Sequence, residues 1–293
     1  MRIPESELII NADGSAFHIH LKPEELADTV IVFGDPGRVK MFEPLFDTIE
    51  AKGQSREFAF ATGIYNGKRV TALSHGIGCD NIDIVMTELD ALANVDFKTR
   101  EVKPEHRTLT VVRIGTCGAI QPEIPLGSFI LSHISVGCDG LMNWYEGRDE
   151  IALLDFEEAF KKATHWAKHL PDPYFVRGSQ KLIDLFADCT VKGMTISASG
   201  FYGPQGRVVR QGLAMPNMLE DFEKFEYKGY KITNFEMEGS ALAGMAAKLG
   251  HDAITVCCAI AHRYLKDANT DYKPRVNELV KLVLDKLTAK LFL

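Results

Sequence analysis

Two short segments combine glycine with arginine directly after an apolar run, and both have the chemistry of an anion site. In Gly34–Arg38 (GDPGR), glycine lets the backbone approach a ligand, and the turn offers N–H groups beside a guanidinium, which suits phosphate. Arg113 follows the apolar run Thr108–Val112, with Thr116 three residues later. Because an arginine at the end of a buried strand is costly unless it is paired, we expect Arg113 to face a carboxylate or an anionic ligand. A plain turn and a structural salt bridge are the alternatives.

A third polar segment, Ser199–Arg207, carries groups that can read a flat heterocycle. Gln205 offers an amide and Arg207 a planar guanidinium, a pair that matches a ring edge with carbonyl and N–H groups. Phe201 could stack on the face of such a ring. The alternative is an exposed loop whose polar residues have no ligand.

Glu236 and Glu238 lie at a predicted strand-to-helix junction. Acids in the first turn of a helix are stabilised by its dipole, so helix capping is one interpretation. A carboxylate also accepts hydrogen bonds from vicinal sugar hydroxyls, so a ribose site is the other.

Cys117 lies in a glycine-rich loop without a neighbouring histidine, and we expect a packing residue rather than a nucleophile. From spacing alone, we expect structural rather than functional roles for His18 and Arg56.

The hydrophobic pattern predicts the scaffold that these segments need. Short apolar runs alternate with helical spacing, as in an α/β domain with a largely parallel sheet covered by helices on both faces. Strands are predicted at Thr29–Phe33, Thr108–Ile114, Ser128–Val136, Lys192–Ser197, Ile232–Phe235 and Ala253–Ile260. Helices are predicted at Ile82–Ala93, Phe156–Leu170, Met237–Leu249 and Arg275–Leu291. A turn at Asn66-Gly67 joins Glu57–Gly63 and Lys68–Ser74 as a hairpin. Ligands in such sheets bind beyond the strands' carboxyl ends, where the polar segments follow.

Composition excludes several classes of protein. A net charge of −7 argues against general nucleic-acid binding and against an anionic membrane surface, so an anionic ligand must be met by local arginines. The apolar runs are too short to span a bilayer, and the N-terminus lacks a signal-peptide pattern, so we expect a soluble, cytoplasmic chain. Six cysteines without a CxxC spacing predict reduced thiols rather than disulfides or zinc ligands. No linker or repeat divides the sequence, and we expect one domain over residues 1–293.

In this order, the segments resemble nucleoside phosphorylases of the uridine phosphorylase type. The similar segments are Phe17-His18, GDPGRV (Gly34–Val39), SREF (Ser55–Phe58), SHGIG (Ser74–Gly78), RIGTCGAIQP (Arg113–Pro122), Phe201–Arg207, NFEMEGSAL (Asn234–Leu242) and His262-Arg263. The resemblance implies a mixed, partly barrel-like sheet and phosphorolysis, in which a nucleoside and inorganic phosphate give a free base and ribose 1-phosphate. It implies no organic cofactor. Some similar proteins hold a monovalent cation at the dimer interface with a Glu after the SR pair, and Glu57 fits that position, but Asn81 lies where a Ser is usual, so we assign no metal.

The resemblance also implies a role for each matching residue. Phosphate would be bound by Gly34, Arg38, Arg113 and Thr116, with Arg56 reaching the site from a neighbouring subunit. The ribose would be held by Glu236, Met237 and Glu238, and by His18 across a dimer interface. The base would be bound by Phe201, Gln205, Arg207 and Arg263. Catalysis would depend on Arg113, Thr116, Glu238, Gln205 and Arg207. The chain would form a homo-oligomer, either a dimer or a hexamer built as a trimer of dimers.

The choice of base separates relatives within the family. Purine-cleaving members place an aspartate after the last strand, whereas Cys258–His262 contains no acid. Together with Gln205 and Arg207, this favours uridine and a role in pyrimidine salvage. The alternatives are a nucleosidase that uses water, a purine nucleoside phosphorylase, and a non-catalytic nucleoside-binding protein. The preference between uridine and thymidine or deoxyuridine stays open.

Overall fold

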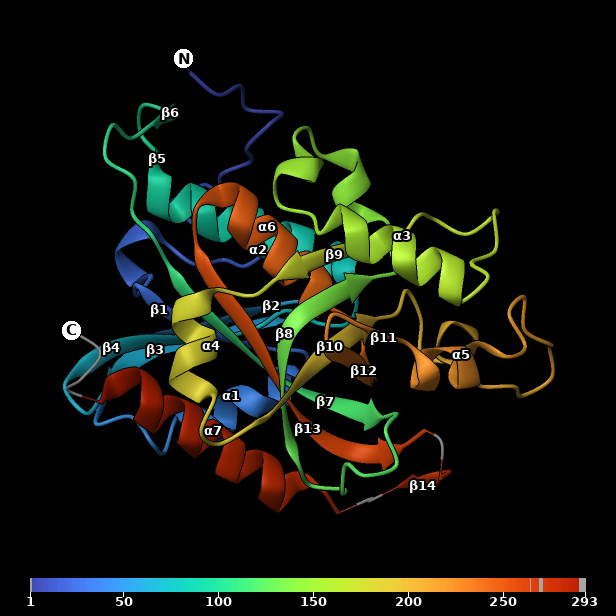
Figure 1. Cartoon of the computed structure of the whole chain (residues 1–293). Coiled ribbons are helices and arrows are strands. Elements are labelled where there is room, and N and C mark those ends of the chain that lie inside the picture. The colour runs from blue at the N-terminus through green and yellow to red at the C-terminus, as the bar shows by residue number, and fades with distance from the viewer. Residues whose placement is uncertain (1, 264, 269–270, 290–293) are drawn as a thin grey trace.

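The computed structural model describes residues 2–263, 265–268 and 271–289 (Figure 1). Its α-helices are α1 (Val39–Phe42), α2 (Cys79–Asn94), α3 (Leu154–Ala163), α4 (Gln180–Phe186), α5 (Met218–Lys224), α6 (Gly239–Leu249) and α7 (Lys273–Thr288). Its first strands are β1 (Thr29–Phe33), β2 (Thr48–Ser55), β3 (Phe58–Tyr65), β4 (Lys68–Ser74), β5 (Val95–Asp96), β6 (Glu101–Val102) and β7 (Thr110–Ala119). They are followed by β8 (Phe129–Gly137), β9 (Tyr174–Arg177), β10 (Val191–Ser197), β11 (Glu226–Tyr227), β12 (Tyr230–Glu236), β13 (Asp252–His262) and β14 (Asp267–Ala268).

A twelve-stranded mixed sheet organises the molecule, in the order β11-β12-β10-β8-β13-β7-β1-β4-β3-β2, with β9 and β14 paired to β8 and β13. A further pairing of β12 with β7 closes β12, β10, β8, β13 and β7 into a ring, so part of the sheet is a barrel. Strand β7 pairs in parallel with both β1 and β13, whereas β8 meets β13 in antiparallel orientation. The predicted α/β class with a mixed, partly barrel-like sheet is therefore confirmed.

Helices cover the sheet on two sides (Figure 1). On one side, α2 and α6 pack against each other over a core that includes Leu89 and Leu242. On the other side, α1, α4 and α7 cover a second core, into which α7 buries Leu279 and Val283 completely. Burial of such a side chain contributes about 1.5–3 kcal/mol, so each apolar helix face holds its helix on the sheet.

Local sequence signals located several elements correctly. Strand β1 has the predicted bounds, and the predicted hairpin is formed by β3 and β4. Asn66 and Gly67 both have positive φ, as a tight hairpin turn requires. Strands β2 and β9 were not predicted, because β2 is a polar, largely exposed edge strand without a regular apolar alternation and β9 has only four residues.

Three predicted boundaries are wrong. Strand β7 continues five residues beyond Ile114, so Arg113 lies within a strand and not at its end. Helix α3 ends at Ala163 and not at Leu170, because His165 adopts a left-handed conformation and Trp166 N–H bonds back to the Lys161 carbonyl. Helix α6 begins at Gly239, which leaves Met237 in the preceding turn. The last residues of the predicted C-terminal helix, from 290 onward, lie outside the described residues.

Among the described residues, no helix has the length and hydropathy that crossing a bilayer requires.

Candidate active site

A cavity of about 750 Å³ lies beside the ends of β1 and β12 and along the second half of β7. Ten of the thirteen predicted site residues line it. They are Gly34, Arg38, Arg113, Thr116, Phe201, Gln205, Arg207, Glu236, Met237 and Glu238. Segments more than 200 residues apart in sequence therefore meet in a single space, which is large enough for a small organic ligand together with an anion.

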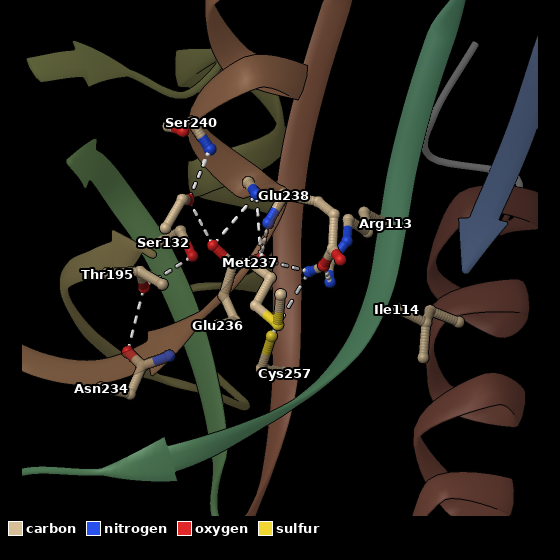
Figure 2. A network of polar contacts seen from close by, with 12 residues as sticks. Arg113, Ile114, Ser132, Thr195, Asn234, Glu236, Met237, Glu238, Ser240 and Cys257 are labelled. Atoms are coloured by element: carbon tan, nitrogen blue, oxygen red, sulfur yellow. Dashed lines mark hydrogen bonds and ion pairs between the residues drawn. The ribbon is translucent and has the colours of Figure 1, made fainter. Parts of the chain in front are cut away.

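Arg113 is the most firmly held cation of this cavity. Its side chain is only 5% exposed and forms ion pairs with Glu236, at 2.8 Å, and with Glu238 (Figure 2). Burial alone would favour a neutral guanidinium, but the charges of Glu238 and Glu236 outweigh it and raise the pKa of Arg113. The prediction that Arg113 faces a carboxylate is thus confirmed, in the form of the salt-bridge alternative, and the anion-binding interpretation stays a prediction.

Gly115 makes room for this guanidinium. A Cβ atom at Gly115 would lie 2.6 Å from Arg113 Nη1 and 2.7 Å from Cys257 Sγ. Residues 115–118 were predicted as a glycine-rich loop, but they belong to β7. The absence of a side chain at Gly115 leaves space beside the strand for the Arg113 guanidinium. Thr116 lines the cavity from this strand. Cys117 is buried in an apolar cluster, and burial raises the pKa of its thiol, which agrees with the packing interpretation.

Arg38 is a second buried cation, and its surroundings differ from those of Arg113. It follows the turn after β1 and donates a hydrogen bond to the Ile114 carbonyl at 3.2 Å. No carboxylate of the described residues lies within ion-pair distance of it. Burial and the charge of Arg113 lower the pKa of Arg38. An uncompensated buried guanidinium at a cavity wall favours binding of an anion.

The turn before Arg38 contributes fewer donors than its sequence suggests. The Asp35 side chain accepts the Gly37 N–H at 2.8 Å, and the Asp35 carbonyl accepts the Arg38 N–H. The expectation that this turn presents free N–H groups to an anion is therefore wrong for these two amides. Gly34 serves close packing, since a Cβ atom there would lie 3.0 Å from the Gly76 carbonyl oxygen.

Glu236 and Glu238 have separate tasks at the start of α6. Glu236, the last residue of β12, accepts hydrogen bonds from the Glu238 and Gly239 N–H groups where α6 begins, and also from the Ser197 hydroxyl, although neither acid lies in the first turn of α6 as predicted. Glu238 accepts the Gly78 N–H at 2.8 Å and pairs with Arg113. Figure 2 shows both carboxylates pointing toward the Arg113 guanidinium. Capping and site interpretations are thus compatible at this junction.

Phe201, Gln205 and Arg207 form the other end of the cavity. The Arg207 guanidinium lies 3.7 Å from the centre of the Phe201 ring, and its Nη1 donates to Gln205 Oε1 at 2.7 Å. Arg207 therefore covers one face of the Phe201 ring, and the expected stacking of Phe201 on a base stays a prediction. Arg263 lies behind the cavity wall and donates to the Gln205 carbonyl at 2.9 Å. Burial and the charge of Arg263 lower the pKa of Arg207 to about 10.

Comparison with known proteins adds to this geometry. Residues 28–291 match the model of the phosphorylase superfamily. The chain belongs to this superfamily. It is 29% identical to a uridine phosphorylase of Thermococcus kodakarensis over 86% of this chain and 79% of that protein. It is 27% identical to a DeoD-type purine nucleoside phosphorylase of Tolumonas auensis over 93% and 98%. A crystal structure of a Trypanosoma brucei nucleoside phosphorylase that shows uridine phosphorylase activity superposes with a TM-score of 0.87 at 29% identity, covering 96% and 99%.

These matches confirm the resemblance stated from the motifs, and the chain is an enzyme of the nucleoside phosphorylase family. Besides Arg263, the predicted site residues His18 and Arg56 do not line the cavity of their own chain. His18 Nδ1 contacts Glu88 Oε1 at 2.6 Å, and the Glu88 carboxylate also accepts the His18 and Ile19 N–H groups. Arg56 is exposed at a bend between β2 and β3 with φ of 52°. Their predicted roles across a subunit interface stay predictions.

Within the part of the chain that the structure describes, Asp90, His106 and His251 have the spacing of metal ligands. His251 Nδ1 accepts the Leu109 N–H at 3.2 Å, so a neutral ring carries its proton on Nε2, 3.2 Å from Asp90 Oδ1. A metal would need the Nε2 lone pair. The group is therefore better described as a polar cluster that joins α2, α6 and β7.

The structure brings three further residues to the site, of which sequence reasoning weighed Glu57 and Asn81 only for an interface cation, without assigning a metal, and gave His75 no role. His75 contacts Arg113, and Glu57 and Asn81 line the cavity beside Gly76. The only signal was their position in or beside the SREF and SHGIG segments, because nothing in residue spacing connects them with Arg113.

Proposed function

We propose that this chain is a uridine phosphorylase, which uses inorganic phosphate to cleave uridine into uracil and ribose 1-phosphate in pyrimidine salvage. One observation carries the proposal: a single cavity contains the guanidiniums of Arg38 and Arg113, with Glu238 beside them, and also the amide and guanidinium of Gln205 and Arg207. The first group suits phosphate and sugar hydroxyls, and the second suits a uracil edge.

The reaction requires this distribution of charge. Cleavage of an N-glycosidic bond develops positive charge on the ribose and negative charge on the departing base. Arg38, Arg113 and Thr116 would hold phosphate as the nucleophile, and Gln205 and Arg207 would stabilise the uracil anion. Holding both reactants in attack geometry can lower the barrier by roughly 7–11 kcal/mol, so a nucleophilic side chain is not required. Phosphate is a co-substrate, and the proposal calls on no organic cofactor.

Glu238 would bind the ribose hydroxyls while paired with Arg113. Its carboxylate keeps Gly78 N–H and the guanidinium as fixed donors, so its direction in the cavity is set before a ligand arrives. Met237 lines the cavity beside it and would contact the sugar. Glu236 already accepts a hydrogen bond from the start of α6 and forms an ion pair with Arg113. It would therefore affect the ribose indirectly, by holding α6 and Arg113 in place.

A purine nucleoside phosphorylase is the second candidate, because a DeoD-type enzyme is 27% identical over 98% of its length. The cavity wall supports the pyrimidine alternative. Ile260 and Ala261 of β13 line the cavity, and Cys258–His262, the part of the strand that contains them, has no carboxylic acid to protonate a purine ring nitrogen. The Trypanosoma brucei relative, which shows uridine phosphorylase activity, supports the same choice.

The complete site is proposed to form in a homo-oligomer, either a dimer or a hexamer. His18 and Arg56 lie outside the cavity of their own chain. In the proposal, Arg56 adds a third guanidinium to the phosphate site of a neighbouring subunit, and His18 reaches the 5′-hydroxyl of the sugar there. His18→Ala and Arg56→Ala should then lose activity singly, whereas mixing either variant with Arg38→Met should regain part of it at low phosphate, because one site of the hybrid then contains Arg38, His18 and Arg56.

Uracil release from uridine, measured with and without phosphate, tests the proposed reaction. Release only with phosphate supports phosphorolysis, release without phosphate indicates a nucleosidase, and no release indicates a binding protein. Inosine, assayed in parallel, distinguishes the purine candidate. Hydrolysis is disfavoured by the chain itself, because a water nucleophile does not need the two buried arginines Arg38 and Arg113 at the cavity wall.

A further inference from the structure

His75, the residue after β4, lies against the Arg113 guanidinium inside the protein. Arg113 donates its Nε–H to His75 Nε2 at 3.2 Å, and His75 has no exposed surface. An imidazole that accepts at Nε2 is neutral and carries its proton on Nδ1. We propose that His75 is a positioning residue whose neutral ring orients Arg113 toward the anion, an inference that rests on the proposed phosphate site.

The neutrality of this acceptor matters because Arg113 already has two acidic partners. Its Nη1 pairs with Glu236 and its Nη2 with Glu238. The remaining Nε–H must also be satisfied, since an unpaired buried donor is unfavourable. A third carboxylate there would add negative charge beside the phosphate and repel it. A neutral imidazole satisfies the Nε–H and leaves the local charge unchanged.

The surroundings of His75 keep the ring neutral. Burial, together with the charges of Arg113 from β7 and Arg38 from the turn after β1, lowers the pKa of His75 well below its ordinary value. No acidic side chain of the described residues pairs with His75. Its Nδ1 is buried and makes no hydrogen bond of ordinary geometry to the described residues, and an interaction with the Gly76 backbone, which raises the pKa, is outweighed. The ring also lies close to Gly34 at the anion end, because a Cβ atom added at Gly34 would be 3.8 Å from His75 Cε1.

Three variants separate this role from simple packing. His75→Gln can place a neutral oxygen acceptor near the position of Nε2, His75→Glu has the same shape with a negative charge, and His75→Leu has no acceptor. We expect His75→Gln to keep the KM for phosphate within about threefold of wild type. His75→Glu and His75→Leu should raise it at least about tenfold, with the KM for uridine changed by less than about twofold.

A second measurement needs no turnover. Phosphate should raise the Tm of the wild type and of His75→Gln by similar amounts, and that of the other two variants by much less. If His75→Leu does not fold, the isosteric Gln and Glu variants still decide the question. Equal phosphate shifts in those two variants would overturn the inference. The predicted order of shifts without uracil release would overturn the proposed reaction alone, and a wild type that phosphate does not stabilise would overturn both.

Discussion

At the anion end of the cavity, Arg113 and Arg38 are 4% and 9% exposed and are held by β7 and the turn after β1, whereas Phe201 at the base end is 50% exposed and lies in a loop. Arg113 is fixed by two carboxylates and a histidine in the central part of the sheet. Arg207 instead packs over one face of the Phe201 ring and donates to Gln205 Oε1. In the proposed function, the anion end is therefore organised before binding, and we expect Arg207 and Phe201 to shift when a base binds.

The two buried arginines also differ from each other. Arg113 is paired with two carboxylates, so its removal leaves two buried acids without a cationic partner. Arg38 donates a hydrogen bond to the Ile114 carbonyl and has no carboxylate partner among the described residues. Its removal therefore eliminates a buried charge without leaving an acid that has lost its cation. The same reaction would then depend on one arginine that stabilises the fold and on another that costs stability. Four substitutions test these contrasts.

Arg113→Ala should have the largest effect. Loss of its donors should lower phosphate-dependent turnover by about a hundredfold to a thousandfold or more. The unpaired Glu236 and Glu238 should also lower the free energy of unfolding by about 3–5 kcal/mol. Steady-state kinetics and urea unfolding measure both quantities. Activity near the wild-type level would refute the anion site.

Arg38→Met should separate binding from stability. Loss of a charge-assisted hydrogen bond of about 1.5–3 kcal/mol should raise the KM for phosphate about tenfold to a hundredfold. The free energy of unfolding without phosphate should stay equal or increase, because a buried cation without a carboxylate is replaced by an apolar chain of similar length. Arg113→Met, which removes a paired cation, is the matched control. A comparable stability loss in both variants would contradict the contrast.

Gln205→Ala should act on the base end only. The variant loses a neutral hydrogen bond of about 0.5–1.5 kcal/mol and no longer holds the Arg207 guanidinium through Gln205 Oε1. The KM for uridine should therefore rise about tenfold. The KM for phosphate should change by less than about twofold, because Gln205 contacts neither Arg38 nor Arg113. An effect confined to phosphate would show that the residue belongs to the other end.

Phe201→Leu should have the smallest effect. Stacking on an aromatic face contributes about 0.5–1.5 kcal/mol beyond buried area, and half of the side chain is exposed, so the KM for uridine should rise about twofold to fivefold. The free energy of unfolding should stay within about 0.5 kcal/mol of wild type. A large loss of stability would show that Phe201 is part of a rigid wall and that the base end is as ordered as the anion end.

Local patterns predicted the parts of the fold that depend on neighbouring residues. The bounds of β1 follow from an uninterrupted apolar run, and the β3–β4 hairpin follows from Asn66-Gly67. The continuation of β7 could not be predicted in this way. Gly115–Gly118 has the composition of a loop, and it is a strand only because β13 pairs along one side and β12 closes the barrel on the other.

The sequence by itself determined which chemical groups are available and in which order, including arginines after apolar runs, acids before a helix, and an amide with an arginine in a polar segment. Only the tertiary structure decided their partners. Glu238 and His75 lie 125 and 38 residues from Arg113 in the chain, yet both contact its guanidinium. Contacts at such separations depend on how the strands pair into a sheet and close into a barrel, and no local spacing encodes that arrangement.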